Sequence, residues 1–219
     1  MTKADVALCC FNDADTLEKT IKSVLEQDCL GTLFIVDDGS TDRTPSVLKS
    51  YKKIRQIRII TNERNQGLAY SLNKIINLSK AKYLARIDAD DTMRPNRLSI
   101  QISYLEENVD VIALGSNAII MNGNNQSYSN VVLTYLQVIS RIHRFNCLLH
   151  PTVMLRRQTI KEVGGYNVGF MRCQDYELWL RLLSHNYKIE NIKNMTTVIN
   201  MRRNRAWKSI NNEFSSLVK

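Results

Sequence analysis

Three acids lie within four positions of the stretch ARIDADDTMRP, residues 85–95: Asp88, Asp90 and Asp91. A mostly apolar run ends at these acids. Alternate residues of a strand point to the same side, so Asp88 and Asp90 can present two carboxylates to one ligand. Mg²⁺ and Mn²⁺ bind one or two protein carboxylates together with substrate phosphates and water. The spacing therefore indicates a divalent-cation site.

An Asp-x-Asp tripeptide is a weak signal on its own, because short motifs of common residues arise by chance. The chain holds a second copy, Asp13-Ala14-Asp15, which we interpret as the acidic entry to a helix. A turn followed by a helix cap is likewise the structural alternative for residues 88–91. The surrounding elements have to decide between the two interpretations.

The first half of the chain alternates between two patterns. Short apolar runs predict strands at 6–11, 33–38, 57–61 and 82–87. Amphipathic spacing predicts helices at 16–27, 44–53, 67–80 and 95–108. The alternation predicts an α/β fold with a mostly parallel sheet and helices on both faces. In such a sheet ligands bind at the carboxyl ends of the strands, where Asp38 and the acids at 88–91 lie.

The second half is less regular. We expect strands at 111–121, 127–133, 150–156 and 196–201, and helices at 133–145 and 173–186. We find no linker, repeat or low-complexity segment, so a single domain is expected.

The chain carries 30 Lys+Arg against 21 Asp+Glu, a net charge of +9. This excess favours phosphate-bearing partners, whether nucleotides, anionic lipid headgroups or nucleic acid. Part of it lies at 200–212, which is compatible with a membrane-surface contact, an oligomer contact or a solvated tail.

Cysteine usage and hydropathy predict the compartment. None of the five cysteines forms a C-x-x-C pair, so neither a zinc site nor a disulfide framework is indicated. The first residues lack a signal-peptide layout, and no apolar run approaches the length of about 20 residues that spans a bilayer. A cytoplasmic location is expected.

Five stretches occur in a characteristic order: VDDGSTDRT, NQGLAYSLN, ARIDADDTMRPNRL, HPTVMLR and GGYN followed by QDYELWLRL. Together, over residues 4–200, they resemble family 2 glycosyltransferases, most closely the bacterial polysaccharide and lipopolysaccharide type. The resemblance implies a GT-A fold, in which a Rossmann-like nucleotide-binding half joins an acceptor-binding half. It predicts one domain over 1–201, divided into halves 1–108 and 109–201, and a basic tail at 202–219.

The resemblance also implies an activity. Such enzymes invert the anomeric centre while moving a sugar from a nucleoside diphosphate sugar, here a UDP-sugar, to a hydroxyl of a glycan or lipid-linked acceptor. Mn²⁺ or Mg²⁺ is the implied cofactor, and cell-surface polysaccharide synthesis is the implied process. Peripheral association with an anionic membrane, at the inner face of the cytoplasmic membrane, is compatible with the basic charge. Nucleic acid is not an expected partner, and the oligomeric state is not predicted.

The resemblance assigns a metal and a nucleotide site. Asp90 would hold the cation, Asp88 would lie beside the ribose and the cation, and Asp91 would assist. Asp38 matches the acid that hydrogen-bonds the base, although an Asx-turn is its structural alternative. The nucleotide-binding residues implied are Phe11, Asn12, Asp38, Asn65, Gly67, Arg86 and Asp88. Phe11 would stack on the base, and Asn65 and Gly67 would line its pocket.

Asp175 matches the general base. A positioned carboxylate that takes the acceptor's proton contributes about 10²–10⁴-fold in rate. A helix N-cap is its structural alternative. His150 matches a histidine that faces the site, with a satisfied structural histidine as the alternative. Gln174 stands where the family usually has Glu, which removes a charged neighbour of Asp175. The first strand ends Cys-Cys-Phe-Asn instead of Pro-x-Tyr-Asn, so Phe11 keeps a stacking face but lacks a hydroxyl.

Two other classes compete with this interpretation. A sugar-nucleotide nucleotidyltransferase should carry a Gly-rich phosphate loop with a basic residue in its first strand–helix turn, and CFNDADT has neither. A non-catalytic nucleotide- or nucleic-acid-binding protein should show a recognition-helix or RNA-binding signature, and we find none.

Overall fold

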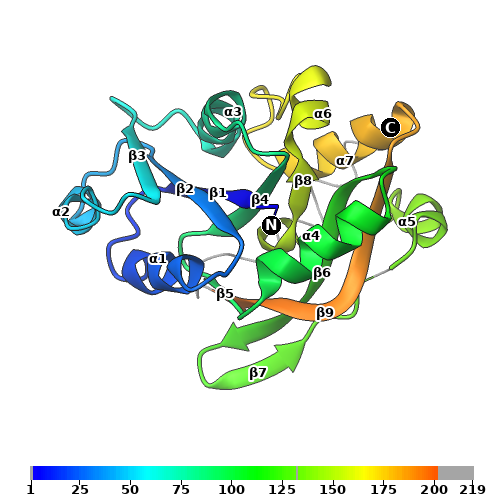
Figure 1. Ribbon diagram of the computed structural model, residues 1–219, viewed down its shortest axis with the longest axis horizontal. Helices are drawn as coiled ribbons and strands as arrows, with labels where there is room; N and C mark the ends of the chain where they lie inside the picture. Colours follow the sequence, from blue (N-terminus) through cyan, green and yellow to red (C-terminus); the bar gives the residue numbers. More distant parts are fainter. Residues whose placement is uncertain (1, 132, 202–219) are drawn as a thin grey trace.

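The computed structural model describes residues 2–131 and 133–201. The predicted basic tail, 202–219, lies outside these residues. Within them the chain forms one nine-stranded mixed sheet with helices on both faces (Figure 1). The strand order is β3-β2-β1-β4-β8-β6-β9-β5, and β7 pairs with β6. The predicted α/β architecture is therefore confirmed.

Four parallel strands form the first half of the sheet: β3 (Ile57–Thr61), β2 (Leu30–Asp37), β1 (Ala4–Cys10) and β4 (Tyr83–Asp88). β1, β2 and β4 are buried on both faces, which is why their sequences are nearly continuous apolar runs. The register pairs Cys10 with Asp37 and Cys9 with Asp88. The carboxyl ends of the three central strands consequently meet at one edge of the sheet.

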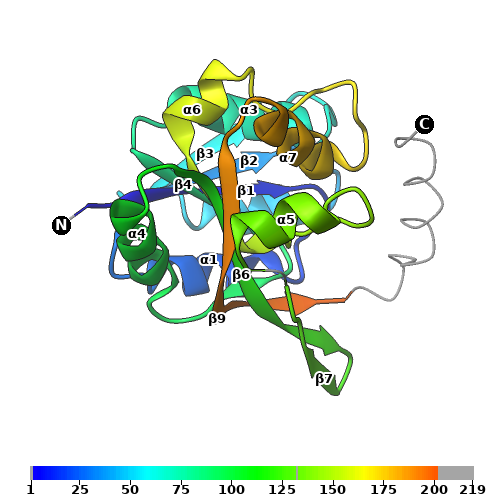
Figure 2. The same ribbon diagram turned by 90° about the vertical axis from the view of Figure 1, so that its right-hand side faces the viewer.

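The second half is mixed. β8 (Met154–Arg156) is antiparallel to β4 and to β6 (Val111–Asn122), and β9 (Lys188–Asn200) is parallel to β6. β5 (Thr92–Met93) pairs with β9 directly after the acids. β7 (Asn125–Tyr128) forms a hairpin with the end of β6 that projects from the body in both views (Figures 1 and 2).

Two hydrophobic cores lie on opposite faces of this sheet, and helices cover both faces (Figure 2). One face is covered by α1 (Leu17–Leu25), α2 (Thr44–Lys49) and α4 (Arg97–Glu107). The other is covered by α3 (Leu68–Leu78), α5 (Tyr135–Arg141), α6 (Arg157–Glu162) and α7 (Gln174–Ser184). Successive strand side chains alternate between the faces, so Val6 and Leu8 enter the first core and Ala7 enters the second. Each fully buried aliphatic side chain contributes about 1.5–3 kcal/mol.

The structure corrects several predicted boundaries. The helix predicted from residue 95 begins at Arg97, because Asn96 has a left-handed φ of 61° and keeps Pro95 outside the helix. The predicted strand 150–156 divides into a 3₁₀ turn, η1 (His150–Thr152), and β8. The strand predicted at 127–133 is the shorter and earlier β7, and the last strand starts at Lys188 instead of 196. β5 was not predicted, since two residues carry no periodicity.

Arg97 is a fully buried cation that ties the two halves together. Its guanidinium donates to five neutral acceptors on four segments: Gln101 Oε1, Pro151 O, Thr197 Oγ1, Arg86 O and Val153 O. Burial, together with the nearby charge of Arg86, lowers its pKa to about 9. The arginine holds β4, whose carboxyl end carries the acids, against η1, α4 and β9.

No helix in the described ranges, 2–131 and 133–201, has the length and apolar character needed to cross a bilayer.

Candidate active site

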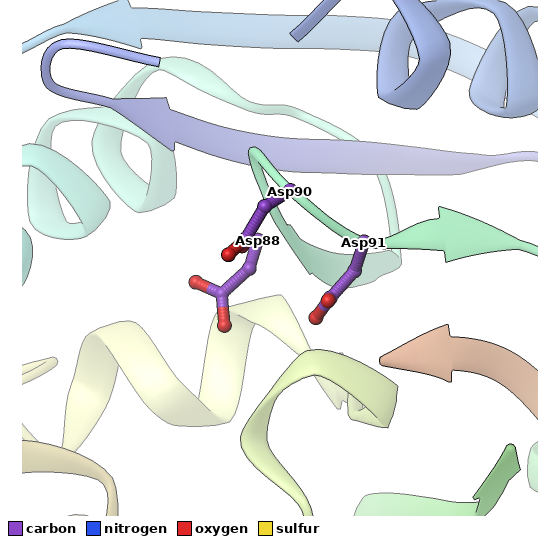
Figure 3. Close-up of side chains that lie close together, drawn as sticks. All are labelled: Asp88, Asp90 and Asp91. Carbon is purple, nitrogen blue, oxygen red and sulfur yellow. The ribbon is translucent and has the colours of Figure 1, made fainter. Parts of the chain in front are cut away.

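The side chains of Asp88, Asp90 and Asp91, here called the acid cluster, project to the same side of the turn after β4 (Figure 3). One carboxylate oxygen from each lies within 4.8 Å of the others. Thr20 of α1 fixes the turn, because its hydroxyl donates to the carbonyls of Ala89 and Asp91 at 2.9 and 2.7 Å. The predicted cluster is therefore formed in the folded protein.

Asn200, at the end of β9, holds the turn from the other side. Its backbone N–H donates to Asp91 Oδ1 at 2.9 Å, and its side-chain amide donates to the carbonyl of Asp90 at 2.6 Å. The last described strand thus completes a site that begins more than a hundred positions earlier in the sequence.

Asp91 carries the strongest indication of a cation. Its Oδ2 is buried and has no hydrogen-bond donor among the residues that the structure describes. Burial, and the neighbouring charges of Asp88 and Asp90, raise its pKa to about 8. A buried carboxylate oxygen without a donor is costly, and a bound cation would satisfy it. The donor set consists of oxygens alone, which suits Mg²⁺ or Mn²⁺.

Arg86 lies in β4, two residues before Asp88, and is almost completely buried. Its guanidinium binds both oxygens of Asp88, with Nη1 to Oδ2 at 2.9 Å and Nη2 to Oδ1 closer still. Burial disfavours the charged form of Arg86, but Asp88, together with Tyr166 and Asp91, outweighs this effect and raises the pKa of Arg86. Its described polar side-chain contacts are thus to Asp88, and its assignment to the nucleotide stays a prediction.

The predicted base-binding acid, Asp38, follows β2 and is buried. It accepts hydrogen bonds from the side chain of Asn62 at 2.6 Å and from the N–H groups of Gln66 and Gly67 at 3.0 and 2.8 Å. A carboxylate offers about four acceptor positions, so one remains for a ligand. The proposed Asx-turn is not its main role, because its partners lie in the segment after β3 and not at residues 39–40.

Gly39 allows the segment after β3 to approach the residues that follow β2. Its φ is +75°, and a Cβ at this position would lie 2.6 Å from the backbone carbon of Arg64 and 2.9 Å from the nitrogen of Asn65. Only glycine fits such a conformation and such a close backbone contact. Asn65 then accepts the N–H of Gly67 at 3.1 Å, while Gly67 itself has a φ of 90°. The structure therefore brings Asp38, Asn65 and Gly67 together, and their role in binding the base stays a prediction.

Phe11 and Asn12 follow β1 at the same edge. Phe11 is 41% exposed, so its ring is available for contact with a ligand. Asn12 has a φ of 57°, and its side-chain oxygen accepts the N–H groups of Thr41 and Asp42 at 2.8 and 3.3 Å. Asn12 therefore fastens the loop after β1 to the loop after β2.

The second Asp-x-Asp copy, Asp13-Ala14-Asp15, is separate from the acid cluster. Asp13 accepts the N–H of Phe11, and Asp15 pairs with exposed Arg43.

Asp175 lies in the first turn of α7. The N-cap position belongs to Cys173, whose φ is 55°, so the expected alternative of a capping Asp175 is not what the structure has. Asp175 Oδ2 accepts a 2.6 Å hydrogen bond from Asn146. Burial raises the pKa of Asp175, while Asn146, local backbone N–H groups and Arg86 oppose the rise. A carboxylate with a raised pKa suits a proton acceptor near neutral pH.

His150, the first residue of η1, is buried. Its Nε2 lies 2.8 Å from the hydroxyl of Tyr166, and its ring packs edge-on against Trp179. Burial and the charge of Arg86 hold the pKa of His150 well below its usual range, so it is neutral. These contacts are those of a structural histidine, and its approach to the metal or the diphosphate stays a prediction. Gln174 is buried at the start of α7.

Sequence reasoning missed three polar residues of the site: Asn62, Asn146 and Asn200. Asn62 follows β3, so its position at a strand's carboxyl end was a usable signal. The other two carry no motif, because their roles depend on contacts made between distant segments.

A sheet in the order 3-2-1-4 that ends in clustered acids, joined to a second half of mixed strands, defines the GT-A class of fold. The model of the family described as "Glycosyl transferase family 2" matches residues 5–171, and the chain belongs to this family.

Curated relatives agree. The chain is 28% identical over 195 residues to an uncharacterized glycosyltransferase of Methanocaldococcus jannaschii, covering 86% of this chain and 67% of that protein. It is 31% identical over 169 residues to the O-antigen biosynthesis glycosyltransferase WbnJ of Escherichia coli, covering 75% and 65%. A third relative, the E. coli UDP-Gal:alpha-D-GlcNAc-diphosphoundecaprenol beta-1,3-galactosyltransferase, is 27% identical over 192 residues, covering 86% and 68%.

Among solved structures, S. aureus TarS 1–349 in complex with UDP-GlcNAc superposes with a TM-score of 0.78 at 16% identity, covering 99% of this chain and 65% of that one. This likeness concerns the fold. The chain spans about two thirds of the length of these relatives and of the TarS chain.

Proposed function

We propose that this protein transfers a sugar from a UDP-sugar to a hydroxyl of a glycan or lipid-linked acceptor, with inversion, in the synthesis of a surface polysaccharide. The observation that carries the proposal is the shared position of Arg86. This buried cation pairs with Asp88 of the acid cluster and also lowers the pKa of Asp175 against the effect of burial. The charge of Arg86 thus acts on both groups of acids, which supports one site for the diphosphate and the proton.

Donor recognition is assigned to the first half of the chain, 1–108. Asp38 would accept the imide N–H of uracil with its remaining acceptor position, Phe11 would stack on the base, and the loop at Asn65 and Gly67 would enclose it. Asp88 would reach the ribose. The relatives' printed names, which include a UDP-Gal-dependent enzyme, and the UDP-GlcNAc complex of TarS support uridine as the nucleoside.

Asp90 would hold a Mn²⁺ or Mg²⁺ ion, with Asp88 and Asp91 completing the protein's share of its ligands. When bound, such an ion neutralises negative charge that develops on the departing diphosphate. Asp91 fits this assignment best, since its buried Oδ2 has no other partner among the described residues.

Acceptor activation is assigned to the second half, 109–201. Asp175 would take the proton of the acceptor hydroxyl as its oxygen forms a bond to the anomeric carbon. The bond from that carbon to the diphosphate oxygen breaks on the opposite face, and the electron pair leaves with the diphosphate. A single displacement of this kind inverts the anomeric centre and needs no protein nucleophile. The O-antigen and diphosphoundecaprenol relatives support a glycan or lipid-linked acceptor, used at the cytoplasmic face of the membrane.

A nucleotide-sugar panel tests the proposal. Purified protein with Mn²⁺ should be thermally stabilised by one or more UDP-sugars, because a ligand that binds only the folded state raises stability. With the matching donor and acceptor, Asp175→Asn should lower kcat by about 10²–10⁴-fold and leave donor affinity unchanged. Glu177→Gln is the matched control, since it removes an acid two positions further along α7 that is bound to Arg181. Stabilisation by no nucleoside diphosphate would contradict the proposal, and pyrophosphate release from a nucleoside triphosphate would favour a nucleotidyltransferase.

A further inference from the structure

The segment between α5 and η1, residues 142–149, is fastened to the elements that surround Asp175. The hydroxyl of Tyr176 in α7 donates to the carbonyl of Ile142 at 2.6 Å. The side-chain amide of Asn191 in β9 donates to the carbonyl of Cys147 at 3.1 Å. These bonds hold Asn146, which no motif singled out, next to the first turn of α7.

Asn146 contacts Asp175 with a defined end of its amide. Nδ2 donates to Asp175 Oδ2 at 2.6 Å, and Oδ1 accepts the N–H of Leu148 at 3.2 Å. The Leu148 bond fixes the orientation, because a flipped amide would set an oxygen against a carboxylate and an NH₂ group against an N–H. The donor therefore faces Asp175.

The burial and the charge of Asp175 increase the effect of this hydrogen bond. A hydrogen bond to a charged group is stronger than a neutral one, and it favours the charged form of a carboxylate that burial disfavours. Among the described residues, charged or titratable groups that act on this region include Arg86 from β4, Tyr166 from the turn after α6, and His150, which is bound to Tyr166. Gln174, next to Asp175 in sequence, is neutral.

Building on the function proposed above, we propose that Asn146 is a positioning residue for the base: it fixes the plane of the Asp175 carboxylate toward the acceptor hydroxyl and favours its ionised form. The amide does not touch the substrate and takes no proton. Its effect reaches the reaction only through Asp175.

The test replaces Asn146 by Ala, which removes the donor, and by Asp, which keeps the shape but places a second carboxylate at the same position. The titration of Asp175 is followed in protein with ¹³C-labelled aspartate, and the resonance is assigned with Asp175→Asn. We expect the midpoint to rise by about one pH unit or more in Asn146→Ala, and further in Asn146→Asp. The acid limb of the kcat–pH profile should move by the same amount, with little change in the KM for the donor.

Tyr176→Phe is the matched control. It removes the bond that fastens the same segment to α7, yet it leaves the amide of Asn146 in place. Its midpoint should remain at the wild-type value even if its melting temperature falls. Equal midpoint shifts in Tyr176→Phe and Asn146→Ala would show that the segment acts only as structure, and would overturn the proposal. So would an unchanged titration in Asn146→Ala.

The two proposals fail separately, because the titration requires no turnover. A shifted titration with undiminished transfer in Asp175→Asn would refute Asp175 as the base, and with it the catalytic role of Asn146. An unshifted titration with transfer abolished in Asp175→Asn would refute the positioning role and leave the proposed function intact.

Discussion

Arg86 donates to both carboxylate oxygens of Asp88 from a position that is only 4% exposed. Asp88 in turn lies within 4.8 Å of Asp90 and Asp91, so one buried cation offsets part of the repulsion among three clustered acids. The same charge acts on Asp175 and on His150 in the second half of the chain. The charge of Arg86 thus acts on acids in both halves of the chain.

Arg86→Met should destabilise the protein, because it leaves Asp88 partly buried without its counter-ion. Breaking a buried pair by removing one partner costs about 3–5 kcal/mol, and this loss should appear in urea unfolding at neutral pH. Lys82→Met is the matched control, since it breaks the exposed pair between Lys82 and Glu106. That variant should unfold close to the wild-type midpoint. Similar losses in both variants would argue against a special role for Arg86.

Asp90→Asn should weaken Mn²⁺ binding in the presence of UDP by at least about tenfold, because it removes a charged ligand from the acid cluster. Calorimetric titration of Mn²⁺ into the protein with saturating UDP measures the effect. Asp15→Asn alters the other Asp-x-Asp copy, whose Asp15 is exposed and paired with Arg43. This control should bind Mn²⁺ as the wild type does. Unaltered binding in Asp90→Asn would place the cation elsewhere.

The pH dependence of stability should reveal Asp175. Burial raises its pKa, so the folded protein keeps a proton that the unfolded chain releases above about pH 4. The stability that Asp175 contributes is complete below that pH and is lost as the pH rises through the raised folded value. The Asn side chain of Asp175→Asn cannot ionise, so the variant does not lose this stability. The free energy of unfolding of the variant minus that of the wild type should therefore rise as the pH increases, and then reach a plateau. Urea unfolding at a series of pH values measures the difference, and a constant difference would contradict the assignment.

Gly39→Ala should weaken donor binding by about tenfold or more. The added Cβ would meet the backbone of Arg64 and Asn65 at 2.6 to 2.9 Å and would displace the loop that Asp38 organises. The left-handed φ adds strain of about 1 kcal/mol. Gly123→Ala is the control, because Gly123 has a φ of +59° but nothing within 4 Å of the new Cβ. Gly123→Ala should lose a similar amount of stability through backbone strain, and it should bind UDP normally in calorimetry. Equal affinities in the two variants would exclude the loop from the donor site.

The sequence predicted the first half well because its signals are local. Continuous apolar runs and helical periodicity identified each strand and helix from β1 to α4 except the two-residue β5, and the parallel sheet follows from their alternation. The acids at 88–91 were recognisable because the carboxyl end of a parallel strand is the edge at which ligands bind. The ordered motifs, not any single tripeptide, then gave the family and the GT-A fold.

The second half was predicted less accurately because its strands depend on distant partners. β5 has two residues, and β9 begins with polar residues that interrupt the apolar pattern. His150 matched a family position, but its bond to Tyr166 and its packing on Trp179 could not be predicted from that match. No periodicity or motif in one segment reports which segment will pack against it.

The amino-acid sequence by itself determined the alternating elements, the family and the chemical character of Asp38, Asp90 and Asp175, since these depend on residue type and local order. Only the tertiary structure decided that Arg86 pairs with Asp88 and that Asn200 holds the turn of the acid cluster. It also decided that the amide of Asn146 faces Asp175. A hydrogen bond needs its two atoms within about 3 Å, and that proximity is set by how the whole chain packs around both faces of the sheet.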